Sequence, residues 1–403
     1  MLFLIPKEIQ RDETRVAASP DTVKKLVQQG HQVLVQSQAG LAAGWTDEAY
    51  SLAGASIAAD TTTLYAAKGI ILKIAAPDTH EIDQYAAGSV LIAQLHIYRF
   101  QHLPQLAARQ IDTYALELIP RITRGQSMDV LSSQANIAGY RAVLLAAQYF
   151  PRFMPMFMTA AGSVKPARVL ILGAGVAGLQ AIATAKRLGA IVEVFDVRPA
   201  TREQVESLGA KFIEVALTPE EQAAFAHTGG YAKEMSADYQ ARQQALIAQQ
   251  AALADIIITT ALIPGKPAPD LISADTVAAM RHGSVIVDLA AGLGANGGGN
   301  CPLSHPQDVV RTDNGVIIVG QANLPALMPA DASAMFARNV LTFLGLLLNA
   351  DGHYAPQLDD DIVKATLVTH AQSVYFAAAQ AAPALQSHTQ NNNKEVEESA
   401  CQA

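Results

Sequence analysis

Residues 168–198, "RVLILGAGVAGLQAIATAKRLGAIVEVFDVR", decide the fold of the larger part of this chain. An apolar run leads into Gly173-x-Gly175-x-x-Gly178, and these glycines open a helical segment. A second apolar run follows the helix and ends in Asp196. Strand, glycine turn, helix, strand and acid in this order are typical of a doubly wound α/β domain that binds a dinucleotide.

Each residue of this fingerprint has a physical task. Gly173 permits the tight turn, Gly175 lets a pyrophosphate approach the backbone, and Gly178 lets helix and strand pack closely. The helix N-terminus offers unpaired N–H groups to the phosphates. Asp196 can accept hydrogen bonds from the adenosine ribose and would repel a 2′-phosphate, so NAD(H) is favoured over NADP(H). An arginine near this position can neutralise such a phosphate, but we interpret Arg198 as a solvated or salt-bridging side chain. A glycine-rich turn without a ligand is the alternative, and the complete order of elements argues against it.

Outside the fingerprint, short β-forming runs alternate with helical segments in two sets, which predicts mostly parallel sheets covered by helices. The predicted strands are 2–5, 31–37, 69–74, 89–95 and 112–118 in the first set, and 168–172, 190–196, 255–261, 284–290 and 315–320 in the second. The predicted helices include one opened by Ser19 and Pro20 in the first set, and 176–188, 199–208, 238–253 and 273–281 in the second. Two long helical stretches, 127–149 and 331–349, are expected to brace the two sets against each other.

We therefore predict an α/β fold of two Rossmann-like domains with mostly parallel sheets, joined by long helices. The N-terminal α/β domain is expected to span 1–130, with 325–378 returning to it. The Rossmann NAD-binding domain is expected to span 138–324. Residues 386–403 are polar and low in complexity, and we interpret them as a disordered tail or linker.

The composition narrows the class of protein. Of the 403 residues, 50% are hydrophobic and only 16% are charged, which is typical of a compact globular protein. A net charge of −8 without a basic run argues against nucleic-acid binding. Cys301 and Cys401 are the only cysteines, which excludes a disulfide scaffold and a cysteine-rich metal site, so no metal is expected. The N-terminus has no signal-peptide pattern, and the apolar run 341–350 is about half of a membrane span, so no direct membrane insertion is expected.

The segment "RGQSMDVLSSQANIAGYRA" (124–142) combines many neutral hydrogen-bonding groups and contains no His, Lys or Cys. One interpretation is a polar helix start, in which Ser127 is a cap and Asp129 lies near the helix N-terminus. The other is a set of groups that hold a ligand without acid–base chemistry.

The stretch "PRITRGQSMDVLSSQANIAGYRAV" (120–143), followed by the fingerprint and then by "GGYAKEM", "NCP" and "ADASAMFARNVLTFL", resembles the NAD(H)-binding domain I of proton-translocating nicotinamide nucleotide transhydrogenase, the alpha subunit in bacteria. The resemblance covers about residues 1–370, and its specific mark is the pattern Arg121, Gln126, Asp129 and Ser132. It implies that these four form the catalytic site at the nicotinamide end of the nucleotide. Asp129 and Ser132 would bind the carboxamide and ribose, and Arg121 and Gln126 would hold the ring against its hydride partner.

The resemblance also implies a larger set of NAD(H)-binding residues. Besides the four above, these are Ser127, Met128, Gly173, Gly175, Val176, Gly178, Asp196, Val197, Arg198, Gly230, Tyr231, Gln243 and Leu262. Gly230 and Tyr231 lie in the insertion 226–237, which suits either a lid over the nucleotide or an ordinary surface loop. The loop 290–302 is glycine-rich and a few residues longer than in the family pattern, and it is either a loop near the ligand-binding edge or unstructured.

The activity implied by the resemblance is hydride transfer from NADH to NADP⁺, with NADP(H) bound by a partner domain and proton translocation carried out by a membrane subunit. Transfer between two nicotinamides needs orientation rather than a general acid or base, which fits the neutral groups of 124–142. The implied partners are a second copy in a homodimer, the membrane subunit and the NADP-binding domain. The implied location is cytoplasmic, peripheral on the inner membrane through these partners. We expect the chain to be a separate subunit or a truncated form, active only with its partners.

Two other functions remain open. Alanine dehydrogenase shares this architecture, and Arg15, Lys73 and His96 stand where that relative places a carboxylate anchor and a proton acceptor. Against it, 124–142 follows the transhydrogenase pattern, and "DLAAGLGANGGGNCP" lacks the acid that the dehydrogenase places beyond the corresponding strand. We hypothesise that the three residues are structural. The second alternative is a non-catalytic NAD(H) sensor that recruits a partner.

Overall fold

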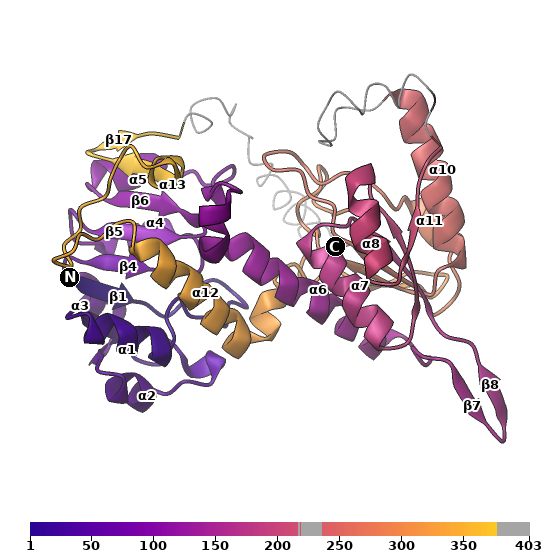
Figure 1. Cartoon of the computed structure of the whole chain (residues 1–403), viewed down its shortest axis with the longest axis horizontal. Helices are drawn as coiled ribbons and strands as arrows, with labels where there is room; N and C mark the ends of the chain where they lie inside the picture. Colours follow the sequence, from indigo (N-terminus) through magenta and orange to yellow (C-terminus); the bar gives the residue numbers. More distant parts are fainter. Residues whose placement is uncertain (217, 219–235, 377–403) are drawn as a thin grey trace, which may run out of the picture.

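The structure, a computed structural model, describes residues 1–216, 218 and 236–376. Figure 1 shows two lobes, each built around one large sheet. The first lobe contains the N-terminal strands together with two strands from 367–374, and the second contains the strands between 168 and 319. The prediction of an α/β fold with two mostly parallel, Rossmann-like sheets is confirmed.

The sheet of the first lobe has the order β17-β16-β6-β5-β4-β1-β2-β3. Strands β1 to β6 are parallel, whereas β16 runs antiparallel to β6 and β17 antiparallel to β16. The order reverses between β1 and β4, where doubly wound domains have a ligand crevice. The strands are β1 Leu2–Ile5, β2 Gln32–Gln36, β3 Ser56–Ala58, β4 Ile70–Leu72, β5 Val90–Ala93, β6 Asp112–Ala115, β16 Leu367–His370 and β17 Ser373–Val374.

The sheet of the second lobe has the order β11-β10-β9-β12-β13-β15-β14, parallel except for β14. Here the order reverses between β9 and β12. The strands are β9 Arg168–Leu172, β10 Ile191–Phe195, β11 Lys211–Ile213, β12 Ile256–Thr259, β13 Val285–Asp288, β14 Val309–Arg311 and β15 Ile317–Val319. A separate hairpin, β7 Phe157–Thr159 and β8 Gly162–Val164, projects from this lobe (Figure 1).

Helices cover both faces of each sheet. In the first lobe, α1 (Pro20–Gln28) and α12 (Pro329–Leu344) pack on one face, and α3 (Thr61–Tyr65), α4 (Thr79–Gln84) and α5 (Leu103–Ala108) on the other. In the second, α6 (Val130–Tyr149), α7 (Val176–Arg187) and α8 (Arg202–Ser207) pack on one face, and α10 (Ala237–Leu253) and α11 (Ala274–Ala278) on the other. The remaining described helices are α2 Asp47–Leu52, α13 Asp361–Thr366, and the 3-10 turns η1 Leu41–Ala43, η2 Leu116–Leu118, η3 Thr123–Met128, η4 Pro199–Thr201 and η5 Leu324–Leu327.

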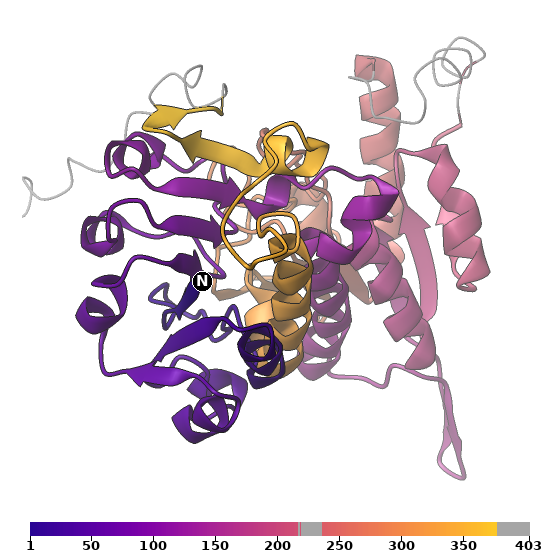
Figure 2. The ribbon, with the colours of Figure 1, turned by 60° about the vertical axis from the view of Figure 1, so that its left-hand side comes forward.

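Helix α6 connects the two lobes. Its first residue, Val130, packs in the core of the first lobe, whereas Ala142 and Ala146 pack in the core of the second. Helix α12 places Phe336 and Phe343 in the first core and lies against α6. Figure 2 shows the orange α12 beside α6 between the lobes. The expectation that two long helices brace the lobes therefore holds for α6, and α12 supports it from the first lobe.

Local sequence explains where the elements begin and where predicted limits were wrong. Ser19 accepts from the N–H of Thr22 and caps α1 in a capping box, as expected. The helix predicted from 127 begins only at Val130, because Asp129 is its N-cap and the residues before it form the turn η3. Strands β3, β11 and β14 were not predicted, since three residues carry too little periodicity to be recognised. Within the described ranges, no helix combines the length and apolar character needed to cross a membrane.

Candidate functional site

The glycine turn joins β9 to α7, at the point where the strand order of the second sheet reverses. Gly173 has a φ of +107°, and a Cβ there would lie 2.5 Å from Thr260 Oγ1. A Cβ on Gly178 would lie 1.9 Å from the carbonyl oxygen of Gly173, so only glycine lets α7 start against the turn. At Gly175, in contrast, nothing in the described chain lies within 4 Å of a Cβ. No described side chain caps α7, so its first N–H groups stay available for a phosphate beside this open space.

Asp196 follows β10 and places its carboxylate beside the glycine turn. Its Oδ2 accepts from the N–H of Ala174 at 2.7 Å. Arg198 donates to the same carboxylate from its backbone N (2.8 Å), from Nε (3.0 Å) and from Nη2 (3.0 Å). The salt-bridging interpretation of Arg198 is thus confirmed, and a ribose bound here would share the carboxylate with that guanidinium.

The segment 121–132 leads from the first lobe into α6. Asp129 caps the helix: its Oδ1 accepts from Ser132 N at 2.9 Å, and its Oδ2 accepts from Ser132 Oγ at 2.5 Å. The structure therefore brings Asp129 and Ser132 together, and the helix-start interpretation is confirmed for Asp129. Ser127 is not the cap. These contacts hold a carboxylate and a hydroxyl in one fixed arrangement, which is also what a carboxamide-binding site requires.

The other predicted residues of this segment differ in exposure. Arg121, Gln126 and Ser127 are exposed, whereas Met128 is 5% exposed and belongs to the core of the first lobe. The carbonyl oxygen of Ser127 accepts from Asn339 Nδ2 on α12 at 2.8 Å. The segment is thus anchored through its backbone and a buried Met, while Arg121, Gln126 and Ser127 are exposed.

Gly139 fixes this segment relative to the glycine turn. A Cβ on Gly139 would lie 2.1 Å from the carbonyl oxygen of Ala177, so α6 and α7 meet backbone to backbone. The N-termini of both helices are therefore held at a set spacing. Sequence reasoning missed Gly139, although a glycine inside a 20-residue helix is a usable signal because glycine destabilises helix interiors.

The remaining predicted nucleotide contacts lie on several elements and range from half-buried to exposed. Val176 and Leu262 are 37% and 53% exposed, Val197 follows Asp196 and is half-buried, and Gln243 is half-buried on α10. Gly230 and Tyr231 lie outside the described residues, as does most of the insertion 226–237 and the whole segment 386–403.

Arg15, the first of the three residues considered for an alanine dehydrogenase site, has partners inside the chain. Its Nε and Nη2 donate to Glu13 at 2.7 and 2.6 Å, and its Nη1 donates to Gln134 on α6 at 2.9 Å. Burial works to raise the pKa of Glu13, yet the hydrogen bonds and charge of Arg15 leave that pKa below its ordinary value. Arg15 is 8% exposed, and its charge is paired with that of Glu13. It is therefore a buried, ion-paired group between the lobes.

Lys73 is fully buried in the first lobe. Its Nζ lies 2.9 Å from Glu81 Oε1 and 3.1 Å from Glu8 Oε2, and Tyr65 donates to the same Glu81 oxygen at 2.8 Å. Two carboxylates therefore surround one ammonium without solvent. This geometry supports the hypothesis that Lys73 is structural.

His96 differs from the other two because its side chain is exposed and its φ is +52°. Glu117 accepts from the N–H of Leu95 (3.1 Å) and of Ile97 (2.8 Å) and so fixes the backbone on both sides. Sequence reasoning gave no sign of this role for Glu117. Within the described chain no hydrogen bond of the His96 ring is found, so ring hydrogen bonding gives no support to a structural role for His96.

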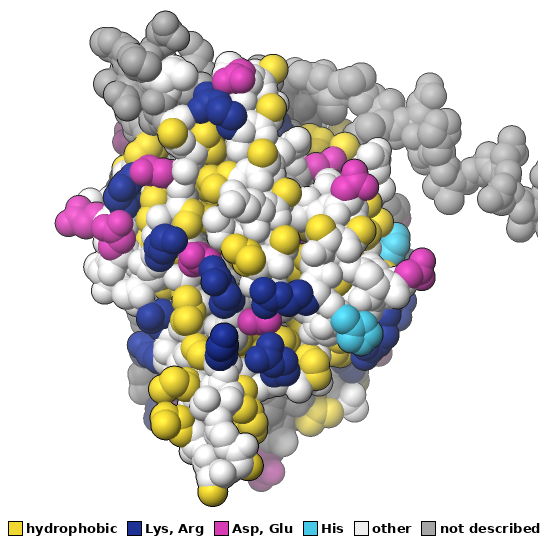
Figure 3. Space-filling model, turned by 90° about the vertical axis from the view of Figure 1, so that its right-hand side faces the viewer, with side chains coloured by type: hydrophobic (Ala, Val, Ile, Leu, Met, Phe, Trp, Pro, Cys, Tyr) yellow, Lys and Arg dark blue, Asp and Glu magenta, His cyan; other side chains and the backbone are white. Residues whose placement is uncertain are grey.

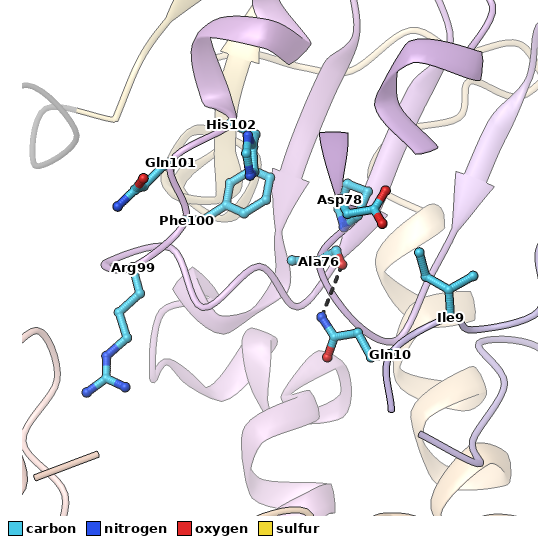
Figure 4. A pocket seen from close by; sticks show the side chains of 9 residues that line it. Ile9, Gln10, Ala76, Asp78, Arg99, Phe100, Gln101 and His102 are labelled. Atoms are coloured by element: carbon cyan, nitrogen blue, oxygen red, sulfur yellow. Dashed lines mark hydrogen bonds between the residues drawn. The ribbon is translucent and has the colours of Figure 1, made fainter. Parts of the chain in front are cut away.

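A cavity of about 360 Å³ lies at the carboxyl ends of β1, β4 and β5 (Figure 4). Its polar side chains serve the chain itself: Gln10 donates to Ala76 O at 3.2 Å, and Asp78 caps α4. Arg99 donates across the lobes to the carbonyl oxygens of Gly292 and Leu293, both at 3.3 Å. Because these groups already have partners, we assign no ligand to this cavity.

Comparison with known proteins agrees with the two-lobe structure. The family profile "Alanine dehydrogenase/PNT, N-terminal domain" matches residues 4–138, and "Alanine dehydrogenase/PNT, C-terminal domain" matches residues 142–377. An NAD(P) transhydrogenase alpha-subunit protein of Rhodospirillum rubrum is 48% identical over 94% of this chain and 98% of that protein. The solved structure of a transhydrogenase from Sinorhizobium meliloti is 44% identical, with a TM-score of 0.82 over 93% of this chain and 100% of that one.

Alanine dehydrogenase is a more distant relative. The enzyme of Bacillus subtilis is 28% identical over 94% of this chain and 93% of that protein. The family profiles, the identities and the internal pairing of Arg15 and Lys73 lead to one conclusion. The chain belongs to the alanine dehydrogenase/PNT family, and within it to the NAD(P) transhydrogenase alpha subunits.

Proposed function

We propose that this chain is the NAD(H)-binding subunit of a proton-translocating transhydrogenase. NADH on this chain would reduce NADP⁺ held by a partner domain, and a membrane subunit would couple this step to proton translocation. The observation that carries the proposal is the pairing of the open glycine turn at Gly175 with the segment 121–132, two features held at fixed spacing by the contact of Gly139 with Ala177.

The residue roles are those implied by the family resemblance, and exposure and hydrogen bonding support them. Asp129 and Ser132, already held together, would bind the carboxamide and ribose. Arg121 and Gln126 are exposed and would hold the nicotinamide where a second nucleotide can reach it. The bound cofactor supplies the hydride, and the chain supplies orientation without a proton-transferring group.

The remaining nucleotide contacts form the rest of the proposed site. The turn residues Gly173, Gly175 and Gly178 would receive the pyrophosphate, and Asp196 with Val197 and Arg198 the adenosine end. The further proposed contacts are Ser127, Met128, Val176, Gly230, Tyr231, Gln243 and Leu262. The proposed domain limits, 1–130 with 325–378 and 138–324, agree with the membership of the two sheets.

A homodimer is part of the proposal, and the β7–β8 hairpin supports it. Every residue of β7 is exposed, and an isolated two-stranded hairpin is only marginally stable. The hairpin and its approach carry exposed apolar side chains: Phe153 (55%), Met156 (62%), Phe157 (43%) and Met158 (76%). Figure 3 shows yellow side chains on this projection and a group of Lys and Arg above it.

Sedimentation of wild type and Met158→Asp tests the proposed homodimer, with a weaker dimer expected for the variant. Attachment at the cytoplasmic face of the inner membrane would then come through partners.

A fluorescence titration tests the central proposal. Wild type should bind NADH clearly and NADPH much more weakly, because Asp196 would repel the 2′-phosphate. Gly175→Ala should fold normally, since its Cβ meets nothing within 4 Å in the described part of the chain, but should lose NADH affinity by about 100-fold because the methyl occupies the pyrophosphate position. Equal affinity of Gly175→Ala and wild type would contradict the assigned site.

A second measurement separates the three functions. When a transhydrogenase NADP(H)-binding domain is supplied, hydride exchange between NADH and an NADP⁺ analogue is expected. Binding without exchange would identify a sensor. Oxidation of NADH with pyruvate and ammonium by the pure chain would instead identify an alanine dehydrogenase.

A further inference from the structure

Asp288, the last residue of β13, is a buried carboxylate that organises the loop after it. It is 0% exposed and accepts five hydrogen bonds from neutral donors: Thr259 Oγ1 (2.8 Å), Ala290 N (2.9 Å), Asn300 N (3.3 Å), Cys301 N (2.9 Å) and Ser304 Oγ (2.7 Å). The returning chain passes directly over it, since a Cβ on Gly299 would lie 2.3 Å from Asp288 Oδ2. The glycine-rich loop 290–302 is therefore wrapped around one carboxylate and is not an unstructured connection.

Asn300 connects the loop 290–302 to the loop that follows β12. It is 0% exposed, and its Nδ2 donates to the carbonyl oxygens of Ala261 and Pro269, both at 2.9 Å. Its Oδ1 accepts from the N–H of Ala261 at 3.0 Å. Both hydrogen-bonding groups of the Ala261 backbone are thus held by a single side chain, whose own backbone is tied to Asp288.

The residues on either side of Ala261 border the nucleotide crevice. Thr260 Oγ1 lies 3.3 Å from the carbonyl oxygens of Leu172 and Gly173, so it touches the glycine turn. Leu262 and Ile263 follow, and they are 53% and 46% exposed. Because β12 is parallel to β9 and adjacent to it, this apolar pair stands at the carboxyl edge of the sheet beside the turn.

We propose that Asp288 and Asn300 are positioning residues for dinucleotide binding, which hold Leu262 and Ile263 as a fixed apolar wall of the crevice. This inference rests on the proposed function. Side chains that are already ordered before binding lose less conformational entropy when the ligand binds. Exposed apolar side chains need neighbouring groups to order them, because they form no hydrogen bonds of their own.

The test compares two asparagines of similar structure. Asn314 lies on the same lobe, and its Nδ2 also binds backbone carbonyl oxygens, those of Val277 (2.9 Å) and Ala278 (3.2 Å), but it is not linked to Ala261. Fluorescence titration of NADH is carried out on wild type, Asn300→Ala and Asn314→Ala at a temperature where circular dichroism shows each folded. Asn300→Ala should raise the dissociation constant about tenfold, and Asn314→Ala should leave it unchanged.

The titration reports both affinity and the number of competent sites. A merely structural role would lower the fraction of competent protein without changing the dissociation constant. Leu262→Ala, whose exposed side chain is not needed for folding, is the second variant and should also weaken binding. An unchanged dissociation constant in Asn300→Ala or in Leu262→Ala, or an equal loss in Asn314→Ala, would overturn the inference. Failure of wild type to bind NADH would instead reject the proposed function itself.

Discussion

The two lobes share one strand order but use the carboxyl ends of their strands differently. The order β3-β2-β1-β4-β5-β6 of the first sheet corresponds to β11-β10-β9-β12-β13-β15 of the second. At the reversal point of the second sheet, the glycine turn leaves open space at Gly175. At the corresponding point of the first sheet, Glu8 follows β1 and accepts from the N–H of Ile74, after β4, at 2.6 Å. The first lobe thus bridges its own crevice with a carboxylate.

This difference shows that topology provides a crevice but side chains decide whether a ligand can use it. Glu8, Lys73 and Glu81 of the first lobe form ion pairs with one another in the interior. The second lobe presents backbone N–H groups and a carboxylate at its edge. A crevice therefore indicates binding when it offers uncapped backbone N–H groups, as at the start of α7, and not merely when charged side chains line it.

The largest expected effect is that of Lys73→Met, which would leave two buried carboxylates without their cation. Loss of one partner of a buried ion pair costs about 3–5 kcal/mol, so the urea midpoint should fall strongly. The triple variant Glu8→Gln, Lys73→Met, Glu81→Gln removes all three charges and should recover most of the loss. Wild-type stability in the single variant would show that Lys73 is not needed to compensate the charges of Glu8 and Glu81.

A smaller effect is expected from Asp196→Ala, which acts in the second lobe. The loss of a charged hydrogen-bond acceptor is worth about 1.5–3 kcal/mol, so NADH affinity should fall roughly 10- to 100-fold in a fluorescence titration. Arg198→Ala is the comparison variant: it keeps the carboxylate and the Ala174 contact but removes the guanidinium, another proposed contact of the adenosine end. If both variants bind NADH as wild type does, Asp196 supports the turn only.

The sequence predicted those parts of the candidate site that a short local pattern of residues determines. The fingerprint placed the glycine turn and Asp196 because every residue of that pattern lies within 31 positions, 168–198. It could not show that Arg198 turns back onto Asp196, or that Lys73 is enclosed by Glu8 and Glu81. The contact of Arg198 with Asp196 is set by the backbone turn after β10, whereas the Lys73 cluster joins residues after β1, after β4 and on α4 through tertiary packing. The contact of Gly139 with Ala177 is also tertiary, between α6 and α7.

The two buried acids Glu8 and Glu13 should respond to pH in opposite directions. Burial raises the pKa of Glu8 despite the charge of Lys73, so its stabilising contribution is complete below the ordinary carboxyl pKa and is lost as pH rises through the raised value. Glu8→Gln should therefore gain stability relative to wild type with rising pH, by at most about 1.4 kcal/mol per pH unit.

Glu13 provides the contrast, because Arg15 holds its pKa below the ordinary value. Its contribution is present above the ordinary carboxyl pKa and is lost as pH falls through the lowered one. The Glu13→Gln variant should thus have a lower free energy of unfolding than wild type at neutral pH. This difference should disappear as the pH falls through the lowered pKa. Urea unfolding of both variants over a pH series measures this, and curves parallel to wild type would contradict both pKa directions.

The smallest expected effect concerns Cys301, which is fully buried in the second lobe. Burial raises the pKa of its thiol to about 11, so almost no thiolate forms at neutral pH. In a Cys401→Ser background, the native chain should not react with a thiol reagent until urea unfolds it. Rapid labelling of the native chain would mean that the loop around Asp288 opens readily.

The first lobe is completed by residues far from its beginning. Strand β16 pairs Leu367 with Tyr114 of β6, and Phe336 and Phe343 of α12 fill the core around β1. During synthesis on the ribosome, the whole second sheet emerges before these residues do. The second lobe can therefore fold while the first is still an incomplete sheet with an uncovered apolar face. The nucleotide crevice, bordered by a segment that α12 anchors, is then finished only after α12 itself has been made.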